Sequence, residues 1–212
     1  SIKFEKSEVN KIVKKYCPQF EECIENEYLA VNIENELKTL KEKIAEFCTK
    51  QRIKDNWIKE YAICENLIEQ IPHLRAIVDK ANKEAISLIE NADVDLKTYE
   101  SNIEYAIANK SQIDSLKETV KNHYSESNIP KTNRIYYDRL EDLCERIEKE
   151  KEKLITHDIN IFEKIVEEKN CREPETLIAI ESANFLYPDF LTMAKERLAS
   201  LRVERDPAHV YK

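Results

Sequence analysis

Apolar residues recur at steps of three and four between Val31 and Ile71, which is the longest regular pattern in the chain. This spacing is typical of one face of an amphipathic helix. Polar residues fill the face between Thr49 and Lys54, so the pattern predicts two helices fused end to end or one helix that changes partner there. A helix of about 40 residues spans about 60 Å, which favours an elongated helical bundle with Trp57 buried in its core. The apolar positions are Ile33, Leu37, Leu40, Ile44, Phe47, Ile53, Trp57, Tyr61, Cys64, Leu67 and Ile71.

The rest of the chain alternates between further amphipathic stretches and turn signals. Prolines and Asn/Asp/Ser clusters mark the expected ends of helices. Thr132 or Asn133 can cap the helix that follows them. A joint is possible at Thr156–Asp158. The tail from Arg205 to Lys212 is expected to be loose. The predicted helical stretches are Val9–Ile24 with a break at Cys17–Pro18, Leu74–Ile89 after an end or kink at Pro72, Leu96–Val120, Tyr136–Leu154, Ile155–Val166, Leu177–Leu186 and Pro188–Leu201.

Composition supports an all-α fold. The 212 residues include no glycine, so tight hairpins, glycine phosphate loops and glycine helix ends are missing. Charged residues make up 36% and hydrophobic residues 42%, which suits long two-faced helices. No apolar run is long enough for a membrane span or a signal peptide.

Net charge excludes some partners. The formal charge is −8, so binding to nucleic acid or to an anionic membrane would need a local basic patch. The nearest candidate is Lys11, Lys14 and Lys15, which acidic residues flank on both sides. We therefore expect no nucleic-acid partner and no membrane partner.

Catalytic and metal-binding patterns are missing from the sequence. The four histidines, His73, His123, His157 and His209, lie far apart, and no C-x-x-C motif occurs. A nucleophile with an oxyanion hole usually needs a sharp, glycine-aided turn. We predict no catalytic, metal or cofactor-binding residues, no cofactor and no enzymatic activity.

Six cysteines leave two possibilities open. An even number is compatible with a secreted disulfide framework, in which Cys17 and Cys23 form the best candidate pair because Pro18 can bend the chain between them. Against this, Cys64 and Cys144 fall on apolar stripes, where thiols behave as small buried hydrophobic groups. Reduced cysteines are the favoured interpretation.

Several stretches resemble parts of the α-actinin rod or of a spectrin repeat. The run from Leu29 to Glu36 is similar to the place where that rod leaves its actin-binding head, and the spacing from Phe47 to Trp57 resembles the first helix of a spectrin repeat. The run from Leu96 to Ile103 is similar to the second helix of the repeat that ends the rod. Lys110, Ile113, Asp114 and Leu116 continue this likeness, and Thr132–Asn133 fits the start of the third helix.

The chain also departs from the repeat pattern. No tryptophan stands in the third helix, where Leu143 or Cys144 lies near its place, and the separation from Trp57 to Leu96 is longer than usual. The resemblance implies elongated spectrin-like three-helix bundles with long shared helices. It divides the chain into an N-terminal segment 1–28, a three-helix repeat 29–158 and a C-terminal segment 159–212 that can belong to a second repeat.

The resemblance implies a structural role. The expected function is a rod, spacer and dimerisation module of an actin-cross-linking cytoskeletal protein in the cytoplasm. The expected partner is a second copy in an antiparallel homodimer, with actin bound only through other domains of the full-length protein. Tyr28, Tyr105, Tyr137 and Phe185 are candidate contacts for such a partner. The alternative is an extracellular or pathogen-surface helical adhesion protein with disulfides, and a membrane-curving dimer of long helices is a third possibility.

Overall fold

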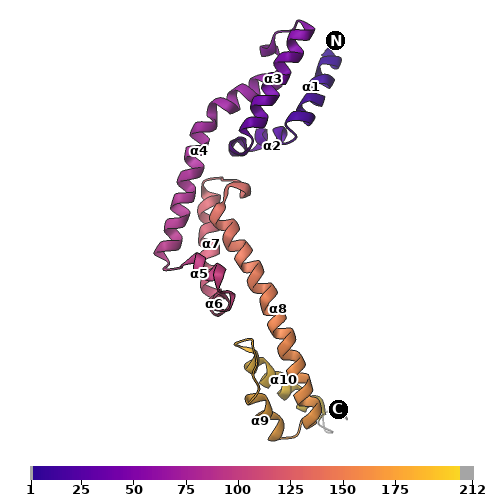
Figure 1. Cartoon of the computed structure of the whole chain (residues 1–212), viewed down its shortest axis with the longest axis vertical. Helices are drawn as coiled ribbons and strands as arrows, with labels where there is room; N and C mark the ends of the chain where they lie inside the picture. The colour runs from indigo at the N-terminus through magenta and orange to yellow at the C-terminus, as the bar shows by residue number, and fades with distance from the viewer. Residues whose placement is uncertain (1, 206–212) are drawn as a thin grey trace. The chain divides into compact units, whose positions relative to one another are not determined.

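The computed structural model describes the backbone of residues 2–205 and the side chains through residue 202. All regular secondary structure in this range is helical. The predicted all-α fold is therefore confirmed (Figure 1). The α-helices are α1 (Ile2–Tyr16), α2 (Phe20–Glu25), α3 (Glu34–Gln51), α4 (Lys59–Asn91), α5 (Leu96–Ser101), α6 (Ile103–Ala108), α7 (Lys110–Glu126), α8 (Ile135–Lys169), α9 (Glu175–Glu181) and α10 (Phe190–Arg205). Short 3-10 helices are η1 (Glu27–Asn32), η2 (Asp55–Trp57) and η3 (Lys131–Asn133).

The chain forms two compact units. The first unit comprises residues 1–94 and 115–140, and the second comprises 95–114 and 141–212. Helices α7 and α8 contribute residues to both units. The predicted division at residues 28 and 158, and the spectrin-like character of the bundles, stay predictions.

The continuous helix predicted from Val31 to Ile71 is wrong, because the chain reverses between α3 and α4. Arg52 follows α3 and adopts the left-handed conformation, with φ 56° and ψ 39°. The N–H of Ile53 then donates to the carbonyl of Cys48 at 2.9 Å, which satisfies an otherwise open carbonyl at the helix end. The polar stretch from residue 49 to 54 thus holds the last residues of α3 and the turn that begins at Arg52, rather than a change of partner.

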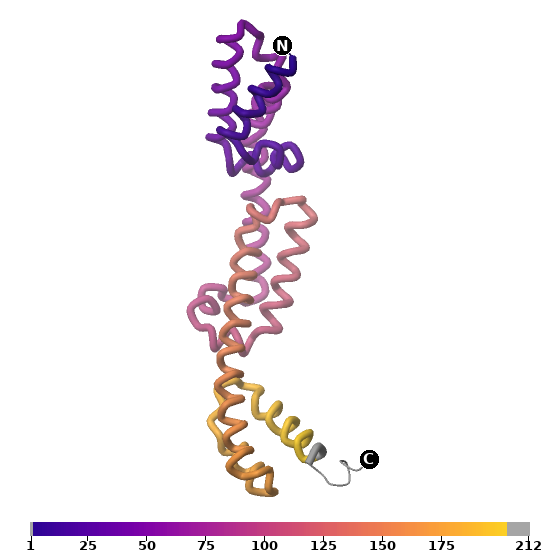
Figure 2. The backbone as a smooth tube through the Cα atoms, turned by 90° about the vertical axis from the view of Figure 1, so that its right-hand side faces the viewer, coloured from indigo at the N-terminus to yellow at the C-terminus, as the bar shows by residue number. Residues whose placement is uncertain are grey.

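Helices α1, α3 and the first part of α4 lie side by side in the first unit (Figures 1 and 2). Two ion pairs connect α3 to α4: Lys41 with Glu65 at 3.4 Å, and Glu34 with Arg75 at 2.7 Å. The pairing with Arg75 and Lys38 lowers the pKa of Glu34. The apolar faces meet in a core of Val9, Cys17, Phe20, Cys23, Ala30, Ile33, Leu37, Leu40, Ile44, Cys48, Cys64, Leu67 and Ile71.

Helix α4 continues past Pro72, so the predicted end at this proline is wrong. Proline lacks an N–H and cannot bond to the carbonyl of Ile68, which loosens the helix at this turn. Figure 1 shows α4 bent along its length, as the alternative prediction of a kink requires. The predicted turn at 91–93 is confirmed, since α4 ends at Asn91 and Asp93 is left-handed.

Beyond Pro72, α4 packs in a second set of contacts within the same unit. The Tyr124 hydroxyl on α7 donates to Asn82 Oδ1 on α4 at 2.6 Å, and it accepts from the N–H of Tyr136 on α8 at 3.4 Å. Tyr124 is fully buried, and burial raises the pKa of its hydroxyl to about 12. One buried phenol therefore joins three helices, and α4 belongs to two successive packing arrangements.

An amide pair connects residues about a hundred positions apart in the first unit. Asn133 Nδ2 donates to Asn32 Oδ1 at 2.9 Å, and Asn32 Nδ2 donates to Asn133 Oδ1 at 3.1 Å. Asn32 Nδ2 also lies 3.3 Å from Thr132 Oγ1. The side chains predicted to cap α8 instead hold η3 against η1.

The single helix predicted from Leu96 to Val120 is divided into α5, α6 and α7. Asn102 begins α6 by accepting from the N–H of Tyr105 at 3.1 Å. Asn109 closes that helix by donating to the Tyr105 carbonyl at 2.8 Å. Asparagine side chains compete with the backbone in this way, and helical spacing alone does not reveal it.

The prediction of a buried Trp57 is also wrong. Trp57 lies in η2, outside both helices, and 71% of its surface is exposed. Its position in the apolar pattern predicted burial only for a continuous helix, and α3 ends before it at Gln51.

We predict that Trp57→Ala changes the free energy of unfolding by no more than about 0.5 kcal/mol, because the indole is exposed. Leu40→Ala on α3 serves as the buried comparison, and we expect it to cost about 2 to 5 kcal/mol. Urea denaturation followed by circular dichroism measures both. A large loss with Trp57→Ala would contradict the exposed position.

Candidate functional site

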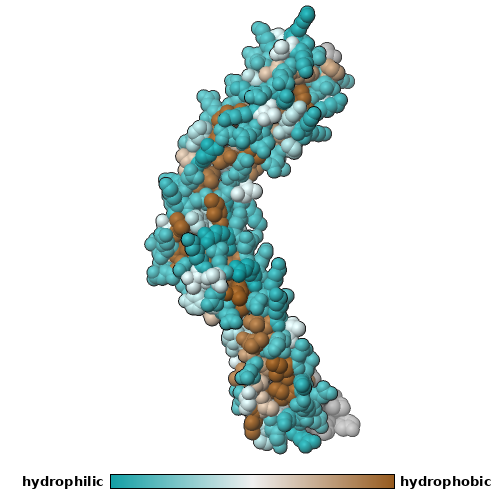
Figure 3. Space-filling view, viewed as in Figure 1, coloured by the Kyte–Doolittle hydropathy of each residue, from teal (hydrophilic) through white to brown (hydrophobic). Residues whose placement is uncertain are grey.

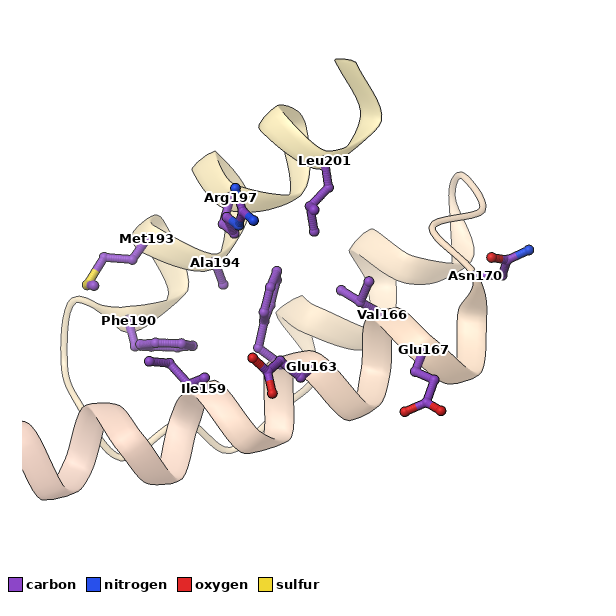
Figure 4. Close-up of a pocket in the computed structure, with 11 residues that line it drawn as sticks. Ile159, Glu163, Val166, Glu167, Asn170, Phe190, Met193, Ala194, Arg197 and Leu201 are labelled. Atoms are coloured by element: carbon purple, nitrogen blue, oxygen red, sulfur yellow. The ribbon is translucent and has the colours of Figure 1, made fainter. Parts of the chain in front are cut away.

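An apolar groove of about 700 Å³ runs between α8 and α10 in the second unit (Figure 4). In Figure 4, Ile159 and Val166 on α8 and Phe190 and Leu201 on α10 point toward one another across it. Its volume falls within the range of sites that bury small ligands or large side chains. The groove is lined by Ile159, Phe162, Glu163, Val166, Glu167, Asn170, Phe190, Met193, Ala194, Arg197 and Leu201.

The floor of the groove is buried and its mouth is open. Phe162, Phe190 and Ala194 belong to the local core, whereas Ile159 and Met193 are exposed by 40% and 42%. Figure 3 shows hydrophobic side chains gathered over the C-terminal part of the chain, where α8 and α10 lie. Apolar side chains at a concave surface are typical of a site that takes an apolar group from a partner.

Two carboxylates lie along one side of the groove. Glu163 and Glu167 are one helical turn apart on α8, both are exposed, and neither forms an ion pair with another side chain described between residues 2 and 202. Arg197 lines the opposite side on α10. The groove is lined by two carboxylates and one guanidinium, so its mouth has a net negative charge and favours a cationic ligand or partner.

Asp158 holds the chain that leads into α10. Its carboxylate is fully buried and accepts from the N–H groups of Leu186 at 2.8 Å and Tyr187 at 2.7 Å. Nδ1 of His157 lies 3.1 Å from the same carboxylate. Helix α8 runs without a break through this position, so the predicted joint at 156–158 is wrong and Asp158 is a positioning residue for the groove.

A second unusual surface lies at the turn between α3 and α4, and we call residues 50–59 the basic tip. This stretch contains Trp57 and four exposed cationic residues, Lys50, Arg52, Lys54 and Lys59, for which no ion pair is found among the described side chains. The Lys54 ammonium lies 5.6 Å from the centre of the Trp57 ring, which is a cation–π contact. Exposed tryptophan beside basic side chains is typical of binding hot spots.

Asp55, the acidic residue within the basic tip, has a partner of its own. A hydrogen bond joins Asp55 to Tyr61, and burial is the main cause of the raised pKa of that tyrosine. Sequence reasoning found no basic patch here because a continuous helix would have distributed these cations around its surface. Because the chain turns at Arg52, these cations instead belong to one turn and its two flanking helix ends, and Lys54 lies against the Trp57 ring.

Of the four aromatic residues expected to meet a partner, only Tyr105 is exposed, by 48%, and it stacks on Tyr99 with ring centres 5.1 Å apart. Phe185 packs against Phe190 at 4.8 Å, beneath the groove. Tyr28 and Tyr137 are half-buried in the first unit. These residues therefore offer little free surface.

All six cysteines are free thiols in this structure. Cys17, Cys23 and Cys64 are buried in the core of the first unit, and burial raises the pKa of each thiol, to about 11 for Cys17 and Cys23 and about 12 for Cys64. A thiol with a raised pKa is a weak nucleophile at neutral pH. The Cys17–Cys23 pair considered as a disulfide is thus part of an apolar core.

Histidines and acidic residues form no metal-binding cluster in the described part of the chain. His123 Nε2 lies 3.0 Å from the carbonyl of Ala81, and the side chain of His73 is exposed. His209 lies outside the described residues, as does the tail predicted to be loose. Between residues 2 and 205, no helix combines the length and the apolar character that a membrane span requires.

Comparison of the chain with protein families, with curated proteins and with solved structures found no match. The likeness to the α-actinin rod therefore depends on the sequence stretches quoted above.

We predict that Asp158→Ala destabilises the second unit by about 1.5 to 3 kcal/mol, because a charged hydrogen-bond acceptor is removed from two backbone N–H groups. Urea unfolding and hydrogen exchange at the amides of α10 measure the effect. Glu168→Ala, at an exposed position on the same helix, is the matched control and should change stability by no more than about 0.5 kcal/mol. Equal effects of the two variants would contradict the positioning role.

The buried thiols predict loss of stability in alkaline solution. Their pKa values are raised in the folded state, so their contribution is fully present below about pH 9 and is lost as the pH rises through 11 to 12. Unfolding free energies measured between pH 8 and pH 12 should fall less steeply in Cys64→Ala than in the unchanged chain. Parallel pH profiles would show that this thiol does not titrate differently on unfolding.

Proposed function

We propose that this chain is a structural helical module that acts as a rod, spacer and dimerisation element of an actin-cross-linking cytoskeletal protein. The observation that carries the proposal is the double use of α4. Its residues up to Ile71 complete a core with α1 and α3, and its residues beyond Pro72 pack with α7 and α8. A helix that passes from one helical bundle into the next is a feature of repeat architectures.

The sharing of α4 has a mechanical consequence. Two bundles on one continuous helix resist bending at their junction more than two bundles on a flexible linker, because the chain stays helical on both sides of Pro72 and only the bond to the Ile68 carbonyl is lost. The reciprocal amide pair of Asn32 and Asn133 adds a second connection within the same unit. A stiff spacer of this kind would hold the modules at its two ends at a set distance.

The finer parts of the proposal come from the resemblance to α-actinin. They are an antiparallel homodimer, a cytoplasmic and cytoskeletal location, and contact with actin only through other domains of a longer protein. The absence of catalytic function is part of the same proposal. The buried, weakly acidic thiols favour it over a disulfide-linked adhesion protein, because they act here as core side chains.

We expect the isolated chain to self-associate as an antiparallel dimer and to show no measurable affinity for actin filaments. Sedimentation equilibrium over a range of micromolar concentrations measures the first property. Chemical cross-linking of mixed heavy and light copies reports the direction of pairing, and co-sedimentation with filaments measures actin binding. A monomer at all concentrations would overturn the dimerisation role. Filament binding by this chain alone would overturn the proposal that actin is bound only through other domains.

A further inference from the structure

We propose that the basic tip of one copy binds in the α8/α10 groove of a second copy. The inference rests on the proposed self-association and names the surfaces that carry it. Each surface lacks what the other provides. The tip exposes a large apolar side chain among cations, and the groove offers an apolar recess beside carboxylates.

The apolar parts match in chemistry, and the groove is large enough to take an indole. Trp57 stands at the end of a turn with 71% of its surface exposed, and the Lys54 ammonium lies 5.6 Å from the centre of its ring. The groove holds about 700 Å³ and is floored by Phe162 and Phe190, whose rings suit an indole. An aromatic anchor in an apolar recess is the usual centre of a protein interface.

The charges give the contact its selectivity. Lys54 and Lys59 flank Trp57, whereas Glu163 and Glu167 line the groove, and all four side chains are exposed without an ion-pair partner among the described residues. In the proposed contact these cations pair with the two carboxylates. Because each copy has a formal charge of −8, two copies repel on average, and local pairing of opposite charges favours this contact over others.

The same contact can be made once or twice between two copies. Two reciprocal contacts close a two-fold pair, in agreement with an antiparallel dimer, and single contacts extend an open chain. Both forms contain the tip in the groove, so one set of variants tests either.

The test uses two charge-reversed forms of the full chain. The tip variant carries Lys54→Glu and Lys59→Glu, and the groove variant carries Glu163→Lys and Glu167→Lys. Position 59 is the first residue of α4, where an acidic side chain is compatible with the helix dipole. Circular dichroism and thermal unfolding verify that both variants fold. Glu152→Lys with Glu168→Lys, at exposed positions of α8 outside the groove, is the matched control.

We expect each variant alone to associate at least about tenfold more weakly than the unchanged chain. An equimolar mixture of the two should associate again, because an acidic tip then meets a basic groove while the native tip meets the native groove. The control should behave as the unchanged chain does. Trp57 is the only tryptophan, so its emission reports the contact and should move to shorter wavelength as concentration rises.

The outcomes separate this inference from the proposed function. A chain that stays monomeric contradicts both. Self-association that neither variant weakens, or a mixture that fails to restore it, overturns the tip-to-groove contact and leaves dimerisation standing. An emission shift produced by phosphatidylserine vesicles but not by rising protein concentration would assign the tip to a membrane surface and overturn the second copy as its partner.

Discussion

The chain reverses direction without glycine, and this constraint shapes the whole fold. Five residues of the described range take up the left-handed conformation that glycine adopts most easily: Arg52, Asp93, Asn128, Asn170 and Cys171. Each follows the end of an α-helix and allows the last carbonyl groups to find a donor. Asparagine and aspartate tolerate this conformation, but for Arg52 and Cys171 it costs about 1 to 2 kcal/mol each. Long helices keep the number of such turns small.

The sequence predicted several helix ends at proline or asparagine correctly, although α4 continues past Pro72 and the ends at Asn102 and Asn109 were missed. The breaks at Cys17–Pro18, at Asn91–Asp93, before Pro130 and at Asn170–Pro174 all appear in the structure, because these residues restrict the backbone locally. The reversal at Arg52 was missed for the opposite reason. Lysine, glutamine and arginine are good helix formers, so nothing local opposed a continuous helix there. The run of polar residues from Thr49 to Arg52 was the signal, because no apolar residue there continues the buried face of α3.

The candidate site was beyond reach of the sequence for a related reason. Phe162 and Phe190 are separated by the whole of α9 and its loops, and only tertiary packing brings them to one groove. The buried carboxylate of Asp158 sets the start of α10, yet in the sequence it stood in a polar triplet that suggested a joint. Trp57 shows the reverse case. Its spacing was that of a core residue, but the continuous helix predicted from Val31 to Ile71 does not form.

Arg52 connects the constraint on turns to the chemistry of the tip. Its position would be filled with less strain by asparagine, which already serves at Asn128 and Asn170. A cationic side chain in a strained backbone position points to a use for the charge, since strain is tolerated where something else depends on the residue. The side chain of Arg52 is exposed and stands in the same turn as Lys54 and Trp57. The turn that replaces the predicted helix therefore both reverses the chain and concentrates positive charge beside its only tryptophan.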